Sequence, residues 1–395
     1  MKIYQEITKL CRASLLKHLP TLLFLLTGVT VLPAHAQSGN QAKPEIFGTF
    51  RPVYAVSESR DRDGNTTTVS QLDARLQVNV AYRLRSDLQF RLRLAGRYST
   101  EQSEFSFPLQ SYTGPSGSYS AGVTTLDIIQ LQWQAHPDLR ITAGRFQNRH
   151  SLAGFIPRGL DRYYSANVGI AHTDGIWLQW NMNRNWRLDG VLNHNSVNGS
   201  SHAARAPMVF TEPASRVGAF ANIGHRNTSG LWVQRELSIS VFPRTFRRDG
   251  QWRNLTVITS RAMMRLPIHG AGAEYWAGAE IGFVPDAPSP ADAGFPVANP
   301  LFETSSFAWQ ASAYANNLFE RHTLGVYYGQ TEPNWVSSFS YRANHTVSEF
   351  RYRYTINTWL NFEFRFRLRT DLYKRTDAAF TAREGDFYAR FNVSF

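Results

Sequence analysis

Apolar and polar residues alternate along many segments of this chain, and this period of two constrains the fold more than any other feature. Between Leu72 and Leu84 every second residue is apolar or aromatic, and the residues between them are polar except Ala81. After a turn at residues 85–87 the pattern resumes from Leu88 to Tyr98. Because successive side chains of a β-strand point to opposite faces, the two segments predict a hairpin with both apolar faces on one side.

The same unit recurs and predicts about sixteen strands. A transmembrane strand needs about 9 to 11 residues with one apolar face. Short connections around Ser86, Pro137, Arg184, Asn227, Pro267, Leu318 and Ile356 alternate with long ones rich in Gly, Pro, Ser and Asn. This asymmetry is typical of a closed membrane barrel. The expected strands are residues 46–56, 72–84, 88–98, 124–135, 139–146, 172–182, 186–193, 215–223, 231–242, 254–265, 271–283, 305–315, 323–329, 345–354, 359–369 and 387–395.

The chain also ends on an alternating segment, residues 387–395, whose last residue is Phe395. This ending resembles the closing strand of bacterial outer-membrane β-barrels, and the strand number and loop order resemble those of porins. The resemblance implies an all-β fold: a transmembrane antiparallel barrel of about sixteen strands, with short periplasmic turns and long extracellular loops. It further implies the outer membrane of a Gram-negative bacterium as location. The residues expected to face lipid and to act in assembly are Phe387, Phe391, Val393 and Phe395.

The start of the chain has the features of a secretory signal. Lys2, Lys9, Arg12 and Lys17 precede an apolar run from Leu19 to Leu32, and Ala34, His35 and Ala36 form an A-x-A cleavage site. We therefore expect residues 1–36 to be a cleaved signal peptide and residues 37–395 to form the barrel. The only cysteine, Cys11, belongs to the signal, so the mature chain can hold no disulfide.

The charge of the chain is strongly positive, with a formal net charge of +12. Removal of the signal takes away four basic residues and one acidic residue, which leaves about +9. Most of the basic residues are arginines within strand-like segments, and no helical or RNA-binding signature accompanies them. We therefore expect no nucleic-acid partner.

If the last strands close against the first ones, their inward faces join into one basic wall. The expected members are Arg351, Arg353, Arg365, Arg367, Arg369, Arg390, Arg51, Arg75, Arg83, Arg91, Arg93 and Arg97. Only Asp73, Glu349 and Glu363 are expected on the same face, so most guanidinium groups should lack a nearby carboxylate. Glu236, Glu274 and Glu280 are expected across the barrel, which predicts a transverse field.

Arginine linings favour anions in aqueous pores. The sequence thus predicts a channel for passive diffusion of small hydrophilic solutes, with anionic solutes preferred. A structural interpretation, in which loops pair with the arginines or water solvates them, remains open.

The connection from Gln147 to Ala171 is unusually apolar, with Phe155, Ile156 and Leu160 among its residues. In porins the corresponding loop folds into the barrel and narrows it, so the resemblance makes Arg149, Arg158, Asp161 and Arg162 candidates for a constriction. Packing over the rim or against a neighbouring subunit is the alternative. A homotrimer is expected by analogy with porins only.

Other functions are weaker predictions. His194, Asn195 and Ser196 invite comparison with outer-membrane lipases, but neighbours on a strand point to opposite faces, so we expect no enzyme. Asp61, Asp63 and Asn65 resemble the start of a calcium loop, yet a hairpin tip uses the same residues, and neither metal nor cofactor is expected. A plugged structural or adhesive barrel and an exporter of acidic polysaccharide remain alternatives. The expected partners are outer-membrane lipid, lipopolysaccharide, the barrel-assembly machinery and anionic solutes.

Overall fold

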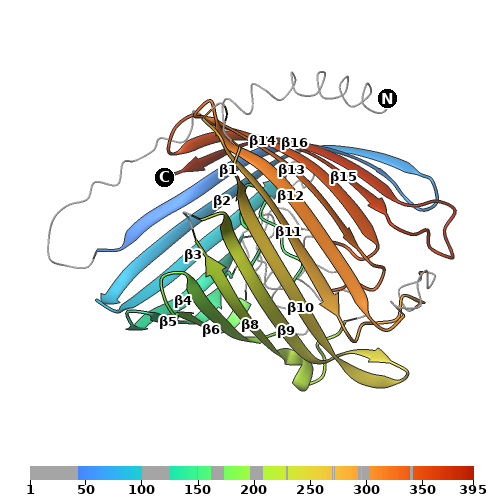
Figure 1. The fold of residues 1–395 in the computed structure, drawn as a ribbon, viewed down its shortest axis with the longest axis horizontal. Helices are drawn as coiled ribbons and strands as arrows, with labels where there is room; N and C mark the ends of the chain where they lie inside the picture. Colours follow the sequence, from blue (N-terminus) through green and yellow to red (C-terminus); the bar gives the residue numbers. More distant parts are fainter. Residues whose placement is uncertain are drawn as a thin grey trace.

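Sixteen strands form one closed antiparallel barrel in the computed structural model (Figure 1). The structure describes residues 43–395 except 100–123, 149, 162–172, 196–207, 228–229, 269, 271, 292–294, 296–302 and 339–340. The strands are β1 (Glu45–Arg60), β2 (Thr66–Arg85), β3 (Leu88–Ser99), β4 (Thr124–His136), β5 (Leu139–Phe146), β6 (Thr173–Asn181), β7 (Trp186–His194), β8 (Val217–Arg226), β9 (Trp232–Arg248), β10 (Gln251–Leu266), β11 (Glu274–Val284), β12 (Ser306–Leu318), β13 (His322–Thr331), β14 (His345–Thr355), β15 (Leu360–Asp371) and β16 (Arg383–Ser394). The predicted all-β class and strand number are confirmed.

Each strand pairs with its neighbours in sequence, and β16 also pairs with β1 to close the barrel. Seven turns lie at the end that holds both chain termini of the barrel, and eight connections, here called L1 to L8 in chain order, lie at the other end. A short 3-10 turn, η2 (Ala214–Arg216), precedes β8. None of the helices described is long and apolar enough to cross a membrane.

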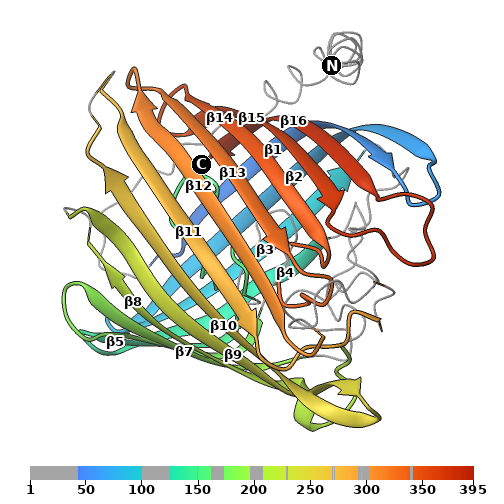
Figure 2. The same cartoon turned by 45° about the vertical axis from the view of Figure 1, so that its right-hand side comes forward.

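Two hairpins are longer than the sequence predicted. β1 and β2 pair from Glu45–Ala81 to Arg60–Thr66, and β9 and β10 extend to Arg248–Gln251, so L1 and L5 are tight turns instead of long loops. Both hairpins project beyond the neighbouring strands (Figure 2). The projecting part of β2 begins with three threonines, Thr66–Thr68. Outside the membrane both faces of a strand can be polar, so apolar alternation no longer marks its extent.

The outer surface carries the apolar positions of the alternating pattern. Exposed side chains on it include Leu76, Leu94, Leu131, Ile176, Leu192, Leu237, Ile281 and Val326. Exposed aromatic residues gather near the seven turns: Tyr82, Trp133, Trp180, Trp186 and Trp359. An apolar band with aromatic residues at its edge matches the environment at a membrane interface.

The terminal strand forms the seam of the barrel. Phe395 and Gly48 exchange backbone hydrogen bonds, with N–O distances of 2.7 and 3.1 Å. A Cβ atom on Gly48 would lie 2.5 Å from both the Phe395 ring and the Gln77 carbonyl oxygen. Glycine at this position therefore permits the close approach of the last residue. On the same strand the rings of Phe387 and Phe391 lie tilted against those of Phe364 and Phe362, and Val393 is buried.

Candidate functional site

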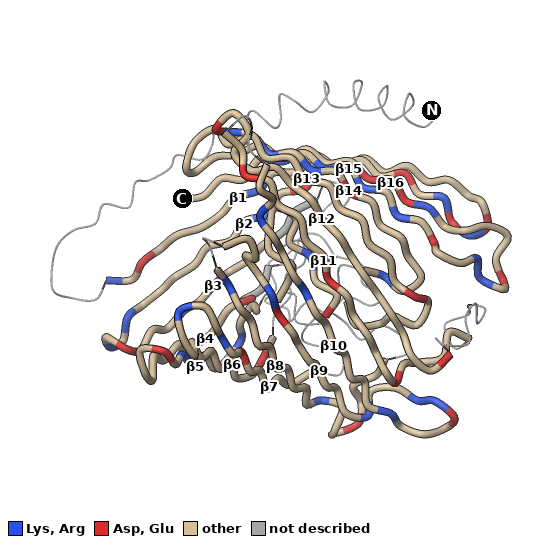
Figure 3. Tube along the Cα trace, in the orientation of Figure 1, with Lys and Arg blue, Asp and Glu red and all other residues tan. Residues whose placement is uncertain are grey.

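The arginines of β14, β15 and β16 lie side by side on the barrel interior, and carboxylates are interleaved with them. Arg351 contacts Glu349 on its own strand, and Arg353 donates to Glu363 at 3.0 Å. Arg367 and Arg369 contact Asp386 and Glu384, at 2.6 and 2.5 Å. Basic segments recur along these three strands in Figure 3. The expectation that most of these guanidinium groups lack a carboxylate is wrong.

The carboxylates that the sequence analysis missed have identifiable origins. Glu384 and Asp386 lie on β16, which begins at Arg383 and not at residue 387 as predicted. Asp127 lies at a register shift where Arg93 opposes Ile128 and Leu94 opposes Leu126. Such a bulge redirects a side chain, and Asp127 is buried beside Arg93 instead of facing outward with Ile129.

Carboxylates are fewer than arginines in this cluster, so single carboxylates are shared among several guanidinium groups. Glu363 lies within 4 Å of Arg351, Arg353 and Arg390, and it also accepts a hydrogen bond from Tyr388. Asp386 lies within 4 Å of Arg365, Arg367 and Arg369. Each carboxylate can offset one unit charge. With Glu349 and Glu384 also counted, three arginines face two carboxylates in each group, so an excess of positive charge remains.

The predicted wall continues onto β1, β2 and β3. Arg51 pairs with Arg75 across β1 and β2, and Arg75 pairs with Arg97 across β2 and β3. Arg97 is described only by its backbone, so its side chain lies outside the described residues. Arg91 is half-buried with its guanidinium 6.0 Å from the Phe47 ring centre, and Arg83 is exposed near the first turn.

L3, residues 147–172, runs inside the barrel in its described part. The Arg158 carbonyl accepts a hydrogen bond from Gln310 of β12, and the Arg158 guanidinium contacts Glu349 of β14. The ring of Phe155 lies 4.7 Å from the guanidinium of Arg353, so L3 reaches the arginine wall. Arg149 and Arg162, the other basic candidates, lie outside the described residues.

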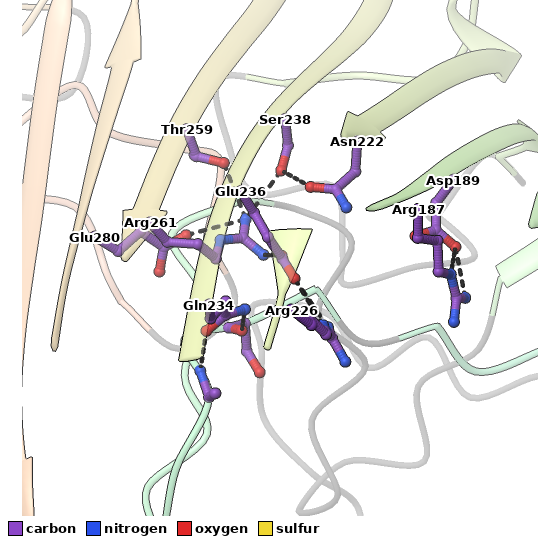
Figure 4. A network of polar contacts seen from close by, with 12 residues as sticks. Arg187, Asp189, Asn222, Arg226, Gln234, Glu236, Ser238, Thr259, Arg261 and Glu280 are labelled. Carbon is purple, nitrogen blue, oxygen red and sulfur yellow. Dashed lines mark hydrogen bonds and ion pairs between the residues drawn. The ribbon is translucent and has the colours of Figure 1, made fainter. Parts of the chain in front are cut away.

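The far end of the described part of L3 is held by a buried charged network (Figure 4). Arg261 of β10 contacts Asp161 of L3 and lies 3.2 Å from Glu280 and 3.4 Å from Glu236. All four side chains have 1 % exposure or less. Arg261 was absent from the sequence prediction, and its single charge offsets only part of the charge of the three carboxylates around it; Arg226 also pairs with Glu236, at 2.9 Å. Glu274 lies elsewhere, 3.5 Å from Arg265.

An apolar core also fills part of the interior. A Cβ atom on the inward-facing Gly282 would meet Trp335 of L7 (residues 332–344) and Leu160 of L3, and one on Gly325 would meet Phe155 and Ile156. L3 and L7 therefore pack on the inner face of β11 and β13. Met208 and Phe210, in L4 (residues 195–216), join the same buried cluster. The described parts of these loops thus lie against β10 to β14 and leave the interior asymmetric.

The remaining sequence candidates show local structural roles. Asp61 accepts backbone hydrogen bonds from Asp63 and Asn65 at 3.0 and 2.8 Å, as in an Asx turn at a hairpin tip. Asn195 accepts a hydrogen bond from Asn193. Ser196, the third member of the lipase-like group with His194, lies outside the described residues.

No protein-family model matches the chain, and no curated protein matches it in sequence. Solved structures do match it over most of their lengths. OprB of Pseudomonas putida, in its high-pH structure, has a TM-score of 0.58, with 10 % identity over 88 % of this chain and 94 % of that one. The chain has the fold of the Gram-negative outer-membrane porins. The outer membrane channel DcaP of Acinetobacter baumannii has a TM-score of 0.58, with 12 % identity over 92 % of this chain and all of that one. An anion-selective porin from Comamonas acidovorans has a TM-score of 0.55, with 9 % identity over 90 % of this chain and all of that one. At these identities the likeness concerns the porin fold alone.

Proposed function

We propose that the protein is an outer-membrane channel for passive diffusion of small hydrophilic solutes, with an arginine wall that favours anions. The observation that supports this most is the sharing of single carboxylates: Glu363 and Asp386 each lie among three guanidinium groups. Arginine stays protonated, so the excess charge persists at any physiological pH. Fixed positive charge along an aqueous path raises the local anion concentration.

Planar-bilayer recordings under a potassium chloride gradient test this function. We expect discrete conductance and a reversal potential of anion-preferring sign. Reversing the charge of Arg365, Arg367 and Arg369 to Glu should move that potential toward cation preference. A matched control reverses Arg184, Arg321 and Arg247, which are exposed in turns or at a hairpin tip, and should leave it unchanged. Cation preference of the unaltered protein would contradict the proposal.

The Asp386→Asn variant should move the reversal potential in the opposite direction from the Arg-to-Glu variant. Asp386 offsets part of the charge of Arg365, Arg367 and Arg369, so its neutralisation should strengthen the anion preference in the same recordings. An unchanged reversal potential would place this cluster away from the ion path.

A plugged barrel is the second candidate, because L3 and L7 pack an apolar core against β11 and β13. The same recordings distinguish the two. A channel gives conductance that depends on the wall, whereas a plugged barrel gives none in the folded, inserted state.

The signal peptide is a separate proposal. We propose that residues 1–36 are removed during export and that the mature protein starts at Gln37. N-terminal sequencing of the protein purified from outer membranes should begin with Gln-Ser-Gly-Asn. A start at Met1 would contradict it.

A further inference from the structure

One row of inward-facing residues crosses the barrel wall from β10 to β16, and it has a gap on β13. Each residue of the row stands directly opposite the next one on the neighbouring strand. Every member carries a side chain except Gly325, so the wall is locally thinner there. The row is Arg265, Trp276, Tyr314, Gly325, Arg351, Arg365 and Tyr388.

The tip of L3, here residues 154–156, lies in the gap at Gly325. A Cβ atom on Gly325 would lie 2.9 Å from Cδ1 of Phe155 and 3.3 Å from Cδ1 of Ile156. These separations leave no room for a side chain on β13. Glycine within a strand often marks such a close approach, and here its missing side chain admits the L3 tip.

An aromatic stack bounds the gap on one side. The ring centres of Tyr314 and Trp276 lie 5.6 Å apart with 18° between the ring planes, and the guanidinium of Arg265 lies 5.4 Å from the Trp276 ring centre. A Cβ atom on Gly154 would overlap the Tyr314 ring, and Gly154 has a φ of +125°, which residues with a side chain rarely adopt. The stack therefore limits the position of the L3 tip from this side.

The arginine wall bounds the gap on the other side, and the Phe155 ring partly covers it. The ring centre lies 4.7 Å from the guanidinium of Arg353 and 5.9 Å from that of Arg351. Phe155 has 7 % exposure and Arg351 has 9 %. Both arginines lie within 4 Å of Glu363, and Arg351 also pairs with Glu349, so their charge is offset only in part. A ring face attracts a nearby guanidinium, more strongly where water is excluded.

We propose that Phe155 is a specificity-determining residue, which covers part of the arginine wall and so limits the fixed charge that a solute meets. The inference rests on the proposed channel function and deepens it. With the L3 tip in the gap, an apolar ring stands in front of the Arg351 and Arg353 guanidinium groups. A shorter side chain at position 155 would open both groups to water and to anions, which positive charge along an aqueous path attracts.

Disulfide cross-linking tests the position of the L3 tip without requiring conductance. Cys11 is the only cysteine in the chain, so in a Cys11→Ser background two introduced cysteines report only on each other. Phe155→Cys with Gly325→Cys should cross-link on mild oxidation in isolated outer membranes, because a disulfide needs Cβ atoms about 3.5–4.5 Å apart. Phe155→Cys with Gly190→Cys is the matched control and should not cross-link, since Gly190 lies on β7 with no atom within 4 Å of an added Cβ.

Planar-bilayer recordings of Phe155→Ala test the effect on selectivity. The reversal potential should move further toward anion preference, because two guanidinium groups lose their cover. Addition of Arg353→Gln should remove most of this shift, whereas Arg353→Gln alone should change the potential less. Phe155→Leu keeps an apolar cover and should resemble the unaltered protein.

Ile156→Ala is the matched control for these recordings. Ile156 also packs on Gly325, so its truncation loosens the L3 tip while the Phe155 ring stays in place. The reversal potential should therefore remain nearly unchanged. Circular dichroism establishes that each variant is folded.

Three results would overturn the inference: no cross-link between positions 155 and 325, a Phe155→Ala variant with an unchanged reversal potential, or an equal shift in Ile156→Ala. A failure of the proposed function looks different. A cross-link without any conductance would remove both the channel and the selective role of Phe155 and keep the L3 tip at Gly325. Anion preference that Phe155→Ala leaves unchanged would keep the channel and remove only the role of Phe155.

Discussion

Two arginines four residues apart on β10 differ in the environment of their charge. Arg261 is fully buried among Asp161, Glu236 and Glu280, whereas Arg265 is 36 % exposed and lies 3.5 Å from Glu274. Removing one partner from a buried network leaves uncompensated charge, which costs about 3–5 kcal/mol, while a solvated pair contributes about 1 kcal/mol or less.

We therefore expect Arg261→Met to lower the free energy of unfolding by about 3–5 kcal/mol and Arg265→Met by about 1 kcal/mol or less. Urea titration of the barrel in lipid vesicles, followed by tryptophan fluorescence, measures both. Equal effects of the two substitutions would show that the Arg261 network does not stabilise the folded barrel.

At the scale of single residues, the alternation in the sequence predicts that the arginines of β15 share one face of the strand. It does not predict the carboxylates that pair with them. Alternation places Arg365 and Arg367 on one face whatever lies opposite, because the period of two is a local property of a strand. The partner Asp386 depends on where β16 begins, and the orientation of Asp127 depends on a bulge. Neither can be read from one segment of sequence alone.

At the scale of elements, the closing seam depends on Gly48. Its substitution by Ala places a methyl group 2.5 Å from the Gln77 carbonyl, a backbone atom that moves only with β2, and equally near the Phe395 ring. We expect Gly48→Ala to reduce the yield of folded barrel, measured as the folded fraction in isolated outer membranes. Gly385→Ala, on the partner strand β16 with no atom within 4 Å of its added Cβ, should fold normally. Normal folding of both variants would mean that the seam tolerates the methyl group.

L3 is the second element whose position yields a prediction, because two charged contacts hold it to two separate parts of the wall. Asp161 contacts Arg261 on β10, and Arg158 contacts Glu349 on β14. The double variant Arg158→Gln and Asp161→Asn should loosen L3, and single-channel conductance should become larger or noisier.

The matched control neutralises a different ion pair by Arg145→Gln and Asp174→Asn, since Arg145 and Asp174 pair between β5 and β6 at 2.7 Å. Conductance of this control should resemble that of the unaltered protein. If both double variants behave alike, L3 does not narrow the pathway.

The strands could be predicted from the sequence, whereas the path of L3 could be anticipated only in outline. Sixteen alternating segments predict a closed barrel, because each strand must present its apolar face to the membrane. An open sheet edge would leave backbone groups without hydrogen bonds in the hydrocarbon. The apolar Phe155, Ile156 and Leu160 indicated packing, yet their contacts come from β11, β13 and L7, far away in sequence. Such contacts depend on the closed barrel and carry no local signal.

At the scale of the whole molecule, the interior has two unlike halves. L3 and L7 pack on β11 and β13, while the arginines lie on β14 to β16 and continue to β3. In the proposed channel, a solute would pass beside the arginine wall, which L3 also reaches through Phe155 and Arg158, so fixed charge would act on the solute mainly from one side. Selectivity should then come from a long-range field more than from the size of the opening.

A field of this kind is screened by salt. The Debye length falls from about 10 Å at 0.1 M to about 3 Å at 1 M ionic strength. With the ratio of salt concentrations across the bilayer held constant, the anion-preferring reversal potential should therefore shrink toward zero as the mean concentration rises from 0.1 to 1 M. A reversal potential independent of salt would mean that the selectivity arises from a narrow contact site and not from the charge of the wall.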